Sequence, residues 1–272
     1  KCPGVAAVES GRLVGYLTGY LIPEFKGIFR GTVSPEYAHA AKGPDRLQIY
    51  RKMYVSLAAS WVSNGYFNHA IVLPASDCKA IDTWFLNGFG ALCIDALRGT
   101  EPVDAVIPQG IEIREVDDDD ICDLIELSDE HMGYMASSPI FLPLPQHRDE
   151  GYFKNWLLEP ENRIWISYFD GEPAGYIKLE ARSFGAAHIV TDDKTLAITG
   201  AYVNKDFRRG GIASALLKTA VVWAGEHEYE RVSVDFETVN ENGKGFWLKH
   251  FKPVCLSLMR HVDERVAWGT QI

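Results

Sequence analysis

The chain has 272 residues, which suggests one large domain or two of medium size. Hydrophobic residues make up 47% and charged residues 24%, a composition typical of a globular protein with a sizeable core. The formal net charge of -10 argues against a general nucleic-acid or membrane-surface binder, and it would suit a cationic amine as substrate.

Five cysteines are scattered along the chain, and none forms a Cys-x-x-Cys pair. This usage indicates reduced thiols in a cytoplasmic protein. The sequence shows no membrane-length apolar stretch, no signal peptide and no His, Cys and Asp residues at metal-ligand spacing. We therefore expect no membrane partner, no nucleic-acid partner and no metal. The seven tryptophans suit cores and interfaces alike, so a homodimer stays open.

The first part of the chain alternates strand-like and helix-like segments. Residues 5–9 and 13–21 are expected to form a strand hairpin, whereas residues 25–41 show no clear periodicity. Asp45 is placed to cap a helix that runs to about Asn64. The next expected elements are a strand over 69–73, a short helix from Asp77 to 87–88 and a strand over 89–97.

A second series of elements follows an expected linker at residues 99–110. The four acids at 117–120 stand at the start of a predicted helix, where they complement the helix dipole rather than bind a cation. Residues 132–148 are proline-rich and are expected to form a substrate-side loop. Strands are expected over 111–116, 164–169, 174–180, 196–203, 231–238 and 254–259, and helices over 121–127, 150–158, 212–226 and 240–249.

The basic, glycine-rich turn Arg208-Arg209-Gly210-Gly211-Ile212-Ala213 lies between the predicted strand 196–203 and the predicted helix 212–226. Glycines let the backbone approach an anion, a helix N-terminus directs free N–H groups at it, and arginines add positive charge. The turn therefore predicts a phosphate-binding site, with an ordinary strand-to-helix turn as the alternative. Its spacing is neither that of a Walker loop nor the Gly-x-Gly-x-x-Gly of dinucleotide folds.

An internal repeat relates the two halves of the chain. Residues 11–17 match residues 171–177 at an offset of 160, and Trp61 matches Trp223 at an offset of 162. Residues 84–89 also match residues 246–251 at an offset of 162. The nearly constant offset predicts two tandem copies of one fold.

The repeat assigns different roles to the two copies. At the offset of 162, the turn falls on residues 46–51, where Gly211 becomes Ile49 and Ala213 becomes Arg51. Side chains at these positions would block a close approach to pyrophosphate. We therefore expect the first copy to serve as a scaffold or as one wall of the active cleft.

The Arg-x-x-Gly-x-Ala spacing of residues 208–213 resembles the pyrophosphate loop of the GNAT family (GCN5-related N-acetyltransferases). A later motif of that family, Asn-x-x-Ala-x-x-Phe-Tyr, is similar to Asn240-Glu-Asn-Gly243-Lys-Gly-Phe246-Trp247, and the resemblance covers residues 111–260. It implies an α+β fold of two tandem GNAT-like domains, each a mixed, mostly antiparallel sheet flanked by helices. The implied boundaries are residues 1–98 for a degenerate copy, 99–110 for the linker and 111–272 for an acetyl-CoA-binding domain.

The resemblance also implies acetyl-CoA as cosubstrate. The backbone of Ala201, Tyr202 and Val203 would pair with the pantetheine arm, and an N–H near Val203 would stabilise the oxyanion. The implied cofactor-binding residues are Ala201, Tyr202, Val203, Arg208, Arg209, Gly210, Gly211, Ile212, Ala213, Ser214, Asn240 and Trp247.

The sequence departs from the family pattern at its catalytic positions. Trp247 stands where many relatives have a tyrosine that protonates the leaving thiolate, and an indole N–H is not acidic enough for that step. His250 is a nearby titratable group, with a surface role as the alternative. The expected general bases are Glu237 and Asp235, on the polar face of strand 231–238, with a solvated ion pair as the alternative. Weaker candidates are Glu180 as a base and Tyr202 as a hydrogen-bond donor.

These inferences predict an acetyl-CoA-dependent N-acetyltransferase that transfers an acetyl group to the primary amine of a small molecule by direct attack on the thioester. The alternatives are a CoA-binding or acyl-CoA-binding module without turnover and a paired scaffold that binds neither.

Overall fold

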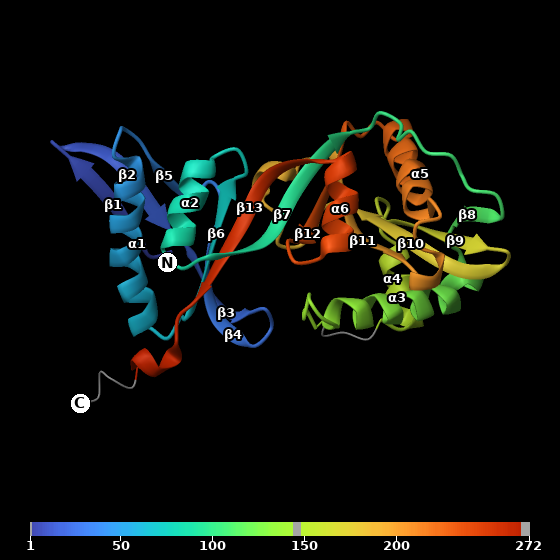
Figure 1. Cartoon of the computed structure of the whole chain (residues 1–272), viewed down its shortest axis with the longest axis horizontal. Helices are drawn as coiled ribbons and strands as arrows, with labels where there is room; N and C mark the ends of the chain where they lie inside the picture. Colours follow the sequence, from blue (N-terminus) through green and yellow to red (C-terminus); the bar gives the residue numbers. More distant parts are fainter. Residues whose placement is uncertain (1, 144–147, 268–272) are drawn as a thin grey trace. The chain divides into compact units, whose positions relative to one another are not determined.

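The computed structural model of the protein describes residues 2–143 and 148–267 (Figure 1). Contacts within the chain define two compact units. Unit 1 comprises Lys1–Asp95, Ala187–Ile189 and Pro253–Ile272, and unit 2 comprises Ala96–Ala186 and Val190–Lys252. The division falls ahead of the expected linker at 99–110, and the C-terminal strand groups with unit 1 rather than with the second copy.

Unit 1 contains two sheets and two helices. Its elements are β1 (Gly4–Glu9), β2 (Arg12–Thr18), β3 (Tyr20–Phe25), β4 (Phe29–Ser34), β5 (His39–Ala41), α1 (Arg46–Ser63), β6 (Asn68–Pro74), α2 (Cys78–Leu86), β7 (Gly90–Gly99, of which the last four residues belong to unit 2), β13 (Lys252–His261) and η4 (Glu264–Ala267). The small sheet has the strand order β1-β2-β5, and the strands of the other follow as β3-β4-β6-β13-β7. Because β13 pairs antiparallel with β6, it belongs to the core of this unit.

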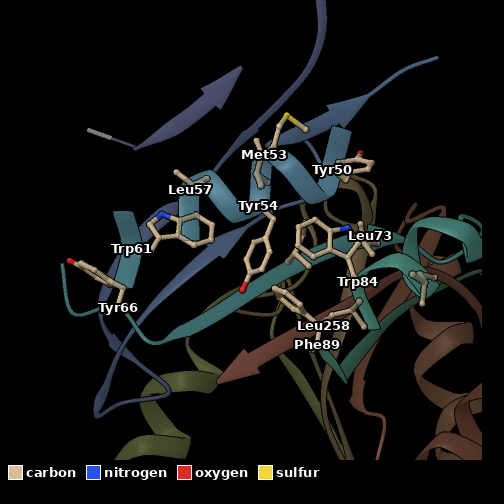
Figure 2. Close-up of a cluster of buried hydrophobic side chains, with 13 residues drawn as sticks. Tyr50, Met53, Tyr54, Leu57, Trp61, Tyr66, Leu73, Trp84, Phe89 and Leu258 are labelled. Atoms are coloured by element: carbon tan, nitrogen blue, oxygen red, sulfur yellow. The ribbon is translucent and has the colours of Figure 1, made fainter. Parts of the chain in front are cut away.

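The core of unit 1 lies against one face of α1. Its residues Tyr50, Met53, Tyr54, Leu57 and Trp61 are buried, at the spacing of three and four residues that places side chains on one side of a helix. Figure 2 shows these side chains gathered with others from α2, β6 and β13. The predicted helix is thus confirmed, and Asp45 stands at its N-cap position but makes no side-chain cap hydrogen bond there.

The region before α1 is more finely divided than expected. The predicted strand 13–21 is interrupted at Gly19, where β2 ends and β3 begins, and residues 25–41 contain β4 and β5. A Cβ on Gly19 would lie 2.9 Å from Oγ of Ser34 and 3.1 Å from Cζ2 of Trp61, so only glycine fits where the strand breaks. The expectation of one continuous strand over 13–21 was therefore wrong. The strands within 25–41 were not predicted, because short strands without an alternating apolar pattern carry little signal in sequence.

The described part of unit 2 contains five strands, four helices and three short 3-10 turns. Its elements are β8 (Ile111–Glu115), η1 (Asp118–Asp120), α3 (Ile121–Ala136), α4 (Glu150–Leu157), β9 (Arg163–Phe169), β10 (Glu172–Glu180), η2 (His188–Val190, of which the first two residues belong to unit 1), β11 (Thr195–Val203), η3 (Lys205–Phe207), α5 (Ile212–Glu226), β12 (Arg231–Glu237) and α6 (Glu241–His250). The strand order is β12-β11-β10-β9-β8, in which β11 and β12 are parallel and the other pairs antiparallel. The predicted fold class, mixed and mostly antiparallel sheet with flanking helices, is confirmed.

Acidic residues cap the short turn η1, which runs directly into helix α3. The Asp119 N–H donates to Oδ1 of Asp117 at 2.9 Å, and the Asp117 N–H donates to Oδ2 of Asp120 at 3.2 Å. This capping box confirms the helix-start role predicted for residues 117–120. The helix continues to Ala136, into the expected loop at 132–148, of which residues 144–147 lie outside the described residues.

Strand registers establish the internal repeat. In unit 1, β2 pairs with β5, and in unit 2, β10 pairs with β11. Three register pairs of unit 1 have equivalents in unit 2, with residue numbers that differ by 160 on the first strand and by 162 on the second. The equivalent pairs are Gly15↔Ala41 and Gly175↔Val203, Tyr16↔Ala40 and Tyr176↔Tyr202, and Leu17↔His39 and Ile177↔Ala201. The sequence offsets therefore reflect a shared backbone arrangement.

None of the helices within residues 2–143 and 148–267 combines the length and the apolar character needed to cross a lipid bilayer.

Candidate functional site

A cavity of about 860 Å³ opens in unit 2. Its walls come from α3, β10, the end of β11, the turn before α5, the first part of α5, and α6. The lining residues are His131, Tyr134, Tyr176, Ile177, Ala201, Tyr202, Val203, Lys205, Phe207, Arg208, Arg209, Gly211, Ile212, Ala213, Ser214, Leu216, Asn240, Asn242, Gly243, Phe246, Trp247 and Lys249. All the predicted cofactor-binding residues except Gly210 are therefore brought together around one space.

Strands β11 and β12 part at the cavity. Their pairing runs from Thr195↔Arg231 to Ile198↔Val234, whereas β11 continues to Val203 in register with β10. Past Ile198, the edge of β11 that faced β12 can offer backbone N–H and C=O groups to an extended ligand. This geometry provides a strand-like binding edge that ends at the basic turn.

The basic turn has the backbone conformation of an anion site. Arg209 and Gly211 are left-handed, with φ of 67° and 87°, and Gly211 is the N-cap of α5 without a side-chain cap. A Cβ on Gly211 would lie 3.3 Å from Cγ of Pro108, so a side chain there is disfavoured by both conformation and space. The first N–H groups of the 15-residue helix α5 are thus left to bind an anion.

The two arginines of the turn differ in their contacts. Nε of Arg208 donates to the Val203 carbonyl at 2.9 Å, and its guanidinium lies 4.8 Å from the ring centroid of Tyr134 and 5.5 Å from that of Tyr202. Arg209 is exposed. Arg208 therefore ties the turn to the end of β11, while Arg209 extends from it toward solvent.

The cavity wall is positively charged, whereas the chain as a whole is negatively charged. Four cations, Lys205, Arg208, Arg209 and Lys249, line it, and no Asp or Glu is among the described lining residues. The chain as a whole carries -10. A cavity with this local excess of positive charge is suited to a ligand with several phosphate groups.

Helix α6 contributes Asn240 and Trp247 to the cavity. Asn240 caps the helix, and its Oδ1 accepts from the Gly243 N–H at 3.0 Å and from the Tyr134 hydroxyl at 2.8 Å. Trp247 is buried and packs edge-on against Phe251, with ring centroids 5.5 Å apart. The Tyr134 contact joins α3 to α6 across the cavity, an interaction that the sequence did not predict.

Two residues of the wall that the sequence did not predict, His131 and Tyr176, form a cluster with Tyr202. Nδ1 of His131 and the Tyr176 hydroxyl are 2.8 Å apart, and the His131 ring stacks on that of Tyr202 at 5.3 Å and 17°. Burial lowers the pKa of His131 to about 4 and raises the pKa of Tyr176 to about 12. Because these residues belong to three separate elements, no local motif identified the cluster.

The predicted general bases lie elsewhere. Asp235 and Glu237 are half-buried on β12 and are not among the described lining residues of the cavity. The polar face of β12 is also partly covered, since Ser233 is only 3% exposed. Burial raises the pKa of the Asp235 carboxyl, while a hydrogen bond with Ser183 lowers it.

The weaker candidates are also placed by the structure. Glu180 forms an ion pair with the buried Lys178 at 3.4 Å, outside the cavity wall. His250 packs on Phe246 with ring centroids 5.0 Å apart and is not among the described lining residues, and burial lowers its pKa. Tyr202 does line the cavity.

This arrangement agrees with comparisons to known proteins. Residues 119–251 match the Acetyltransferase (GNAT) family. This part of the chain, which contains the whole cavity, is similar to the GNAT acetyltransferases.

A curated relative and two solved structures extend the comparison. Streptothricin acetyltransferase A of Bacillus subtilis (strain 168) is 26% identical over 114 residues, which cover 42% of this chain and 59% of that protein. A GCN5-related N-acetyltransferase from Sphaerobacter thermophilus matches with a TM-score of 0.59 at 13% identity, covering 95% of this chain and 80% of the other. A tandem GNAT protein from the clavulanic acid biosynthesis pathway matches with a TM-score of 0.50 at 14% identity, covering 96% and 83%. At these identities the two structures establish a likeness of fold alone.

Proposed function

We propose that the protein is an acetyl-CoA-dependent N-acetyltransferase that acetylates the primary amine of a small molecule. One observation carries the proposal: the free edge of β11, the basic turn and the N-terminus of α5 line the same cavity in unit 2. A strand edge that leads to an anion site matches a ligand with an amide-containing arm and a diphosphate. Acetyl-CoA has this form.

The residues of the cavity have separate roles in this proposal. The backbone of residues 201–203 pairs with the pantetheine arm, and Asn240 approaches the arm from the other side. The first N–H groups of α5 hold the diphosphate beside Gly211, and Arg209 adds charge. Arg208 keeps the turn in place through its bond to Val203.

The reaction we propose is direct transfer. The nitrogen of the neutral amine attacks the acetyl carbonyl, a backbone N–H near Val203 stabilises the oxyanion, and the CoA thiolate leaves. A small-molecule amine is the proposed acceptor class because one relative is named a streptothricin acetyltransferase and because the chain is acidic overall. Unit 1 serves as a scaffold, since residues 46–51 form the first turns of α1 rather than an open turn.

A CoA-binding module without turnover is the second candidate. It is favoured by Trp247, whose indole N–H is not acidic enough to protonate a thiolate, and by the lack of a carboxylate among the described lining residues. Both candidates bind CoA, so only turnover separates them.

The test combines binding and thiol release on the full chain. Acetyl-CoA should raise the melting temperature, and a panel of small amines should include at least one that increases thiol release from acetyl-CoA above the rate without amine. Binding without release for any amine would favour the second candidate. No thermal shift with either CoA or acetyl-CoA would refute both.

A further inference from the structure

His131 and Tyr176 form a pair that the proposed roles above leave unused. Their hydrogen bond of 2.8 Å joins α3 to β10, and the stacking of His131 on Tyr202 fixes the plane of the imidazole. Both side chains line the cavity. Within the described part of the chain, only Nδ1 of His131 takes part in a hydrogen bond, so Nε2 is available to a ligand.

The pair lies where β11 leaves β12. Gly200 is two residues beyond Ile198, the last residue of β11 that pairs with β12. A Cβ on Gly200 would lie 3.3 Å from Cε2 and 3.6 Å from the hydroxyl of Tyr176. The Tyr176 ring therefore packs against this part of β11, and its hydrogen bond to His131 brings the imidazole to the point where the strands part.

His131 is chemically distinct among the described lining residues. The others are apolar, amide, hydroxyl or indole side chains, glycines, and lysines and arginines that are already protonated at neutral pH. Only an imidazole among these types can both take up and release a proton under such conditions. His131 is therefore the side chain of this wall best suited to take up a proton and then release it.

The proposed transfer needs the tautomer of His131 that carries its proton on Nδ1. In that tautomer the Nδ1–H of His131 donates to the Tyr176 oxygen, 2.8 Å away. The lone pair of the imidazole then lies on Nε2.

We propose that His131 carries the proton from the attacking amine to the leaving sulfur. The inference rests on the proposed function. As the bond from the amine nitrogen to the acetyl carbon forms, Nε2 accepts a proton from that nitrogen, directly or through one water. As the carbon–sulfur bond breaks, the sulfur leaves with the electron pair and takes the proton from Nε2, so His131 returns to its neutral form. Tyr176 is a positioning residue that holds the ring through Nδ1.

The surroundings of His131 suit this double role. Burial and the nearby Arg148 and Arg208 lower its pKa, so the ring is neutral and keeps its lone pair at pH 7. The protonated ring would be a much stronger acid than a thiol, whose pKa is about 8.5, so the proton passes readily to the sulfur. The role of the tyrosine that is replaced by Trp247 is then supplied from α3.

The test is the kinetics of His131→Asn with the amine found in the panel. An asparagine amide can still donate to the Tyr176 oxygen but has no group to take up the proton. We expect kcat to fall by at least about 100-fold, the usual size of a general acid–base contribution. The dissociation constant of acetyl-CoA should stay within about threefold of the wild-type value. The matched control is His227→Asn, a histidine of the same unit that is exposed and outside the described cavity wall, and it should keep full activity.

Two further variants separate chemistry from positioning. His131→Ala should regain at least about tenfold in kcat on addition of imidazole. Tyr176→Phe should lose about tenfold in kcat with acetyl-CoA binding unchanged and without rescue by imidazole. A kcat of His131→Asn within about threefold of wild type would overturn the inference, as would a parallel loss of acetyl-CoA binding. If the wild-type protein binds acetyl-CoA yet no amine is acetylated, the proposed function fails first, and this inference fails with it.

Discussion

The two units use equivalent segments of the repeat for different purposes. In unit 2, η3 and the turn 208–211 separate β11 from α5, which begins at Ile212. In unit 1, the helix already begins at Arg46, so residues 46–49 form its first turn instead of a loop. Cγ2 of Ile49 lies only 2.8 Å from the Cβ position of Gly15, so the helix is packed down on β2. An anion site therefore depends on delaying the start of the helix by one turn.

The strand ahead of the helix differs in the same way. In unit 2, the single strand β11 pairs with β12 at its start and with β10 along its length. In unit 1, these two pairings are divided between β4, which is parallel to β6, and β5, which is antiparallel to β2. A continuous strand that leaves one neighbour while staying with the other creates a binding edge, and a divided strand does not.

The largest effect is expected when Gly211 of unit 2 is replaced by isoleucine, the residue type found at the equivalent position, Ile49, of unit 1. Gly211→Ile gives a β-branched residue a left-handed φ, fills the space next to Pro108, and covers the first N–H groups of α5. We expect the affinity for acetyl-CoA to fall by at least about 100-fold, or about 2.7 kcal/mol. Isothermal titration calorimetry at a temperature below the melting transition measures this loss.

A matched substitution shows whether bulk alone is responsible. Gly133→Ile places the same side chain on α3 at a position where a Cβ meets no atom within 4 Å. This variant should bind acetyl-CoA like the wild type. Equal affinities for Gly211→Ile and Gly133→Ile would contradict the assignment of the turn as the diphosphate site.

A second prediction concerns a buried histidine of unit 1. His69 is fully buried between the Tyr54 hydroxyl and the Tyr66 carbonyl, and burial lowers its pKa to about 4. Between pH 6.5 and pH 4 the unfolded chain binds a proton at this residue that the folded unit does not, so stability falls as the pH decreases through this range. From pH 7 to pH 5 the loss should be on the order of 2 kcal/mol.

Hydrogen exchange of the α1 amides at pH 7 and pH 5, corrected for intrinsic rates, measures this local stability. His69→Gln removes the titrating group and should weaken the pH dependence of α1 protection. If the wild-type and variant proteins lose protection equally, His69 is not the source of the acid sensitivity in this unit.

The sequence predicted most of the parts that are defined locally or by the repeat. The apolar stripe of α1, the Asp77 cap of α2 and the hairpin β9–β10 follow patterns within a few residues, and all are present. The turn from Arg208 to Ala213 was assigned from its glycines and charges, and the structure places it at the cavity. Such features are set by short-range chemistry that a single sequence displays.

The features that the sequence did not predict depend on contacts between segments that are far apart in the chain. His131 and Tyr176 are 45 residues apart and become a pair only when α3 covers β10. Asp235 and Glu237 alternate with apolar residues as on an exposed strand, yet β12 is covered, and neither carboxylate is among the described lining residues. Alternation identifies the two faces of a strand, but it does not show which face lines a cavity.

The smallest effects are expected at a position where both units have an arginine. Arg46 and Arg208 differ by 162 in number. Both Nη atoms of Arg46 donate to the Asp77 carboxylate at 2.7 Å, whereas Arg208 bonds to Val203 and lies over Tyr134. The first arginine stabilises its unit, and the second shapes the cavity.

Arg46→Ala should therefore cost about 1 kcal/mol of unfolding free energy, because the ion pair is bidentate but both side chains are nearly one-third exposed. It should leave acetyl-CoA affinity unchanged, whereas Arg208→Ala should weaken that affinity by about tenfold. Since Arg46 lowers the pKa of Asp77, the contribution of the pair is present above the ordinary Asp range near 3.9 and is lost as the pH falls through the lowered value. Urea unfolding at pH 7 and pH 3 should show a smaller Arg46→Ala deficit at the lower pH. A deficit in acetyl-CoA binding by this variant would mean that unit 1 contributes to the cofactor site.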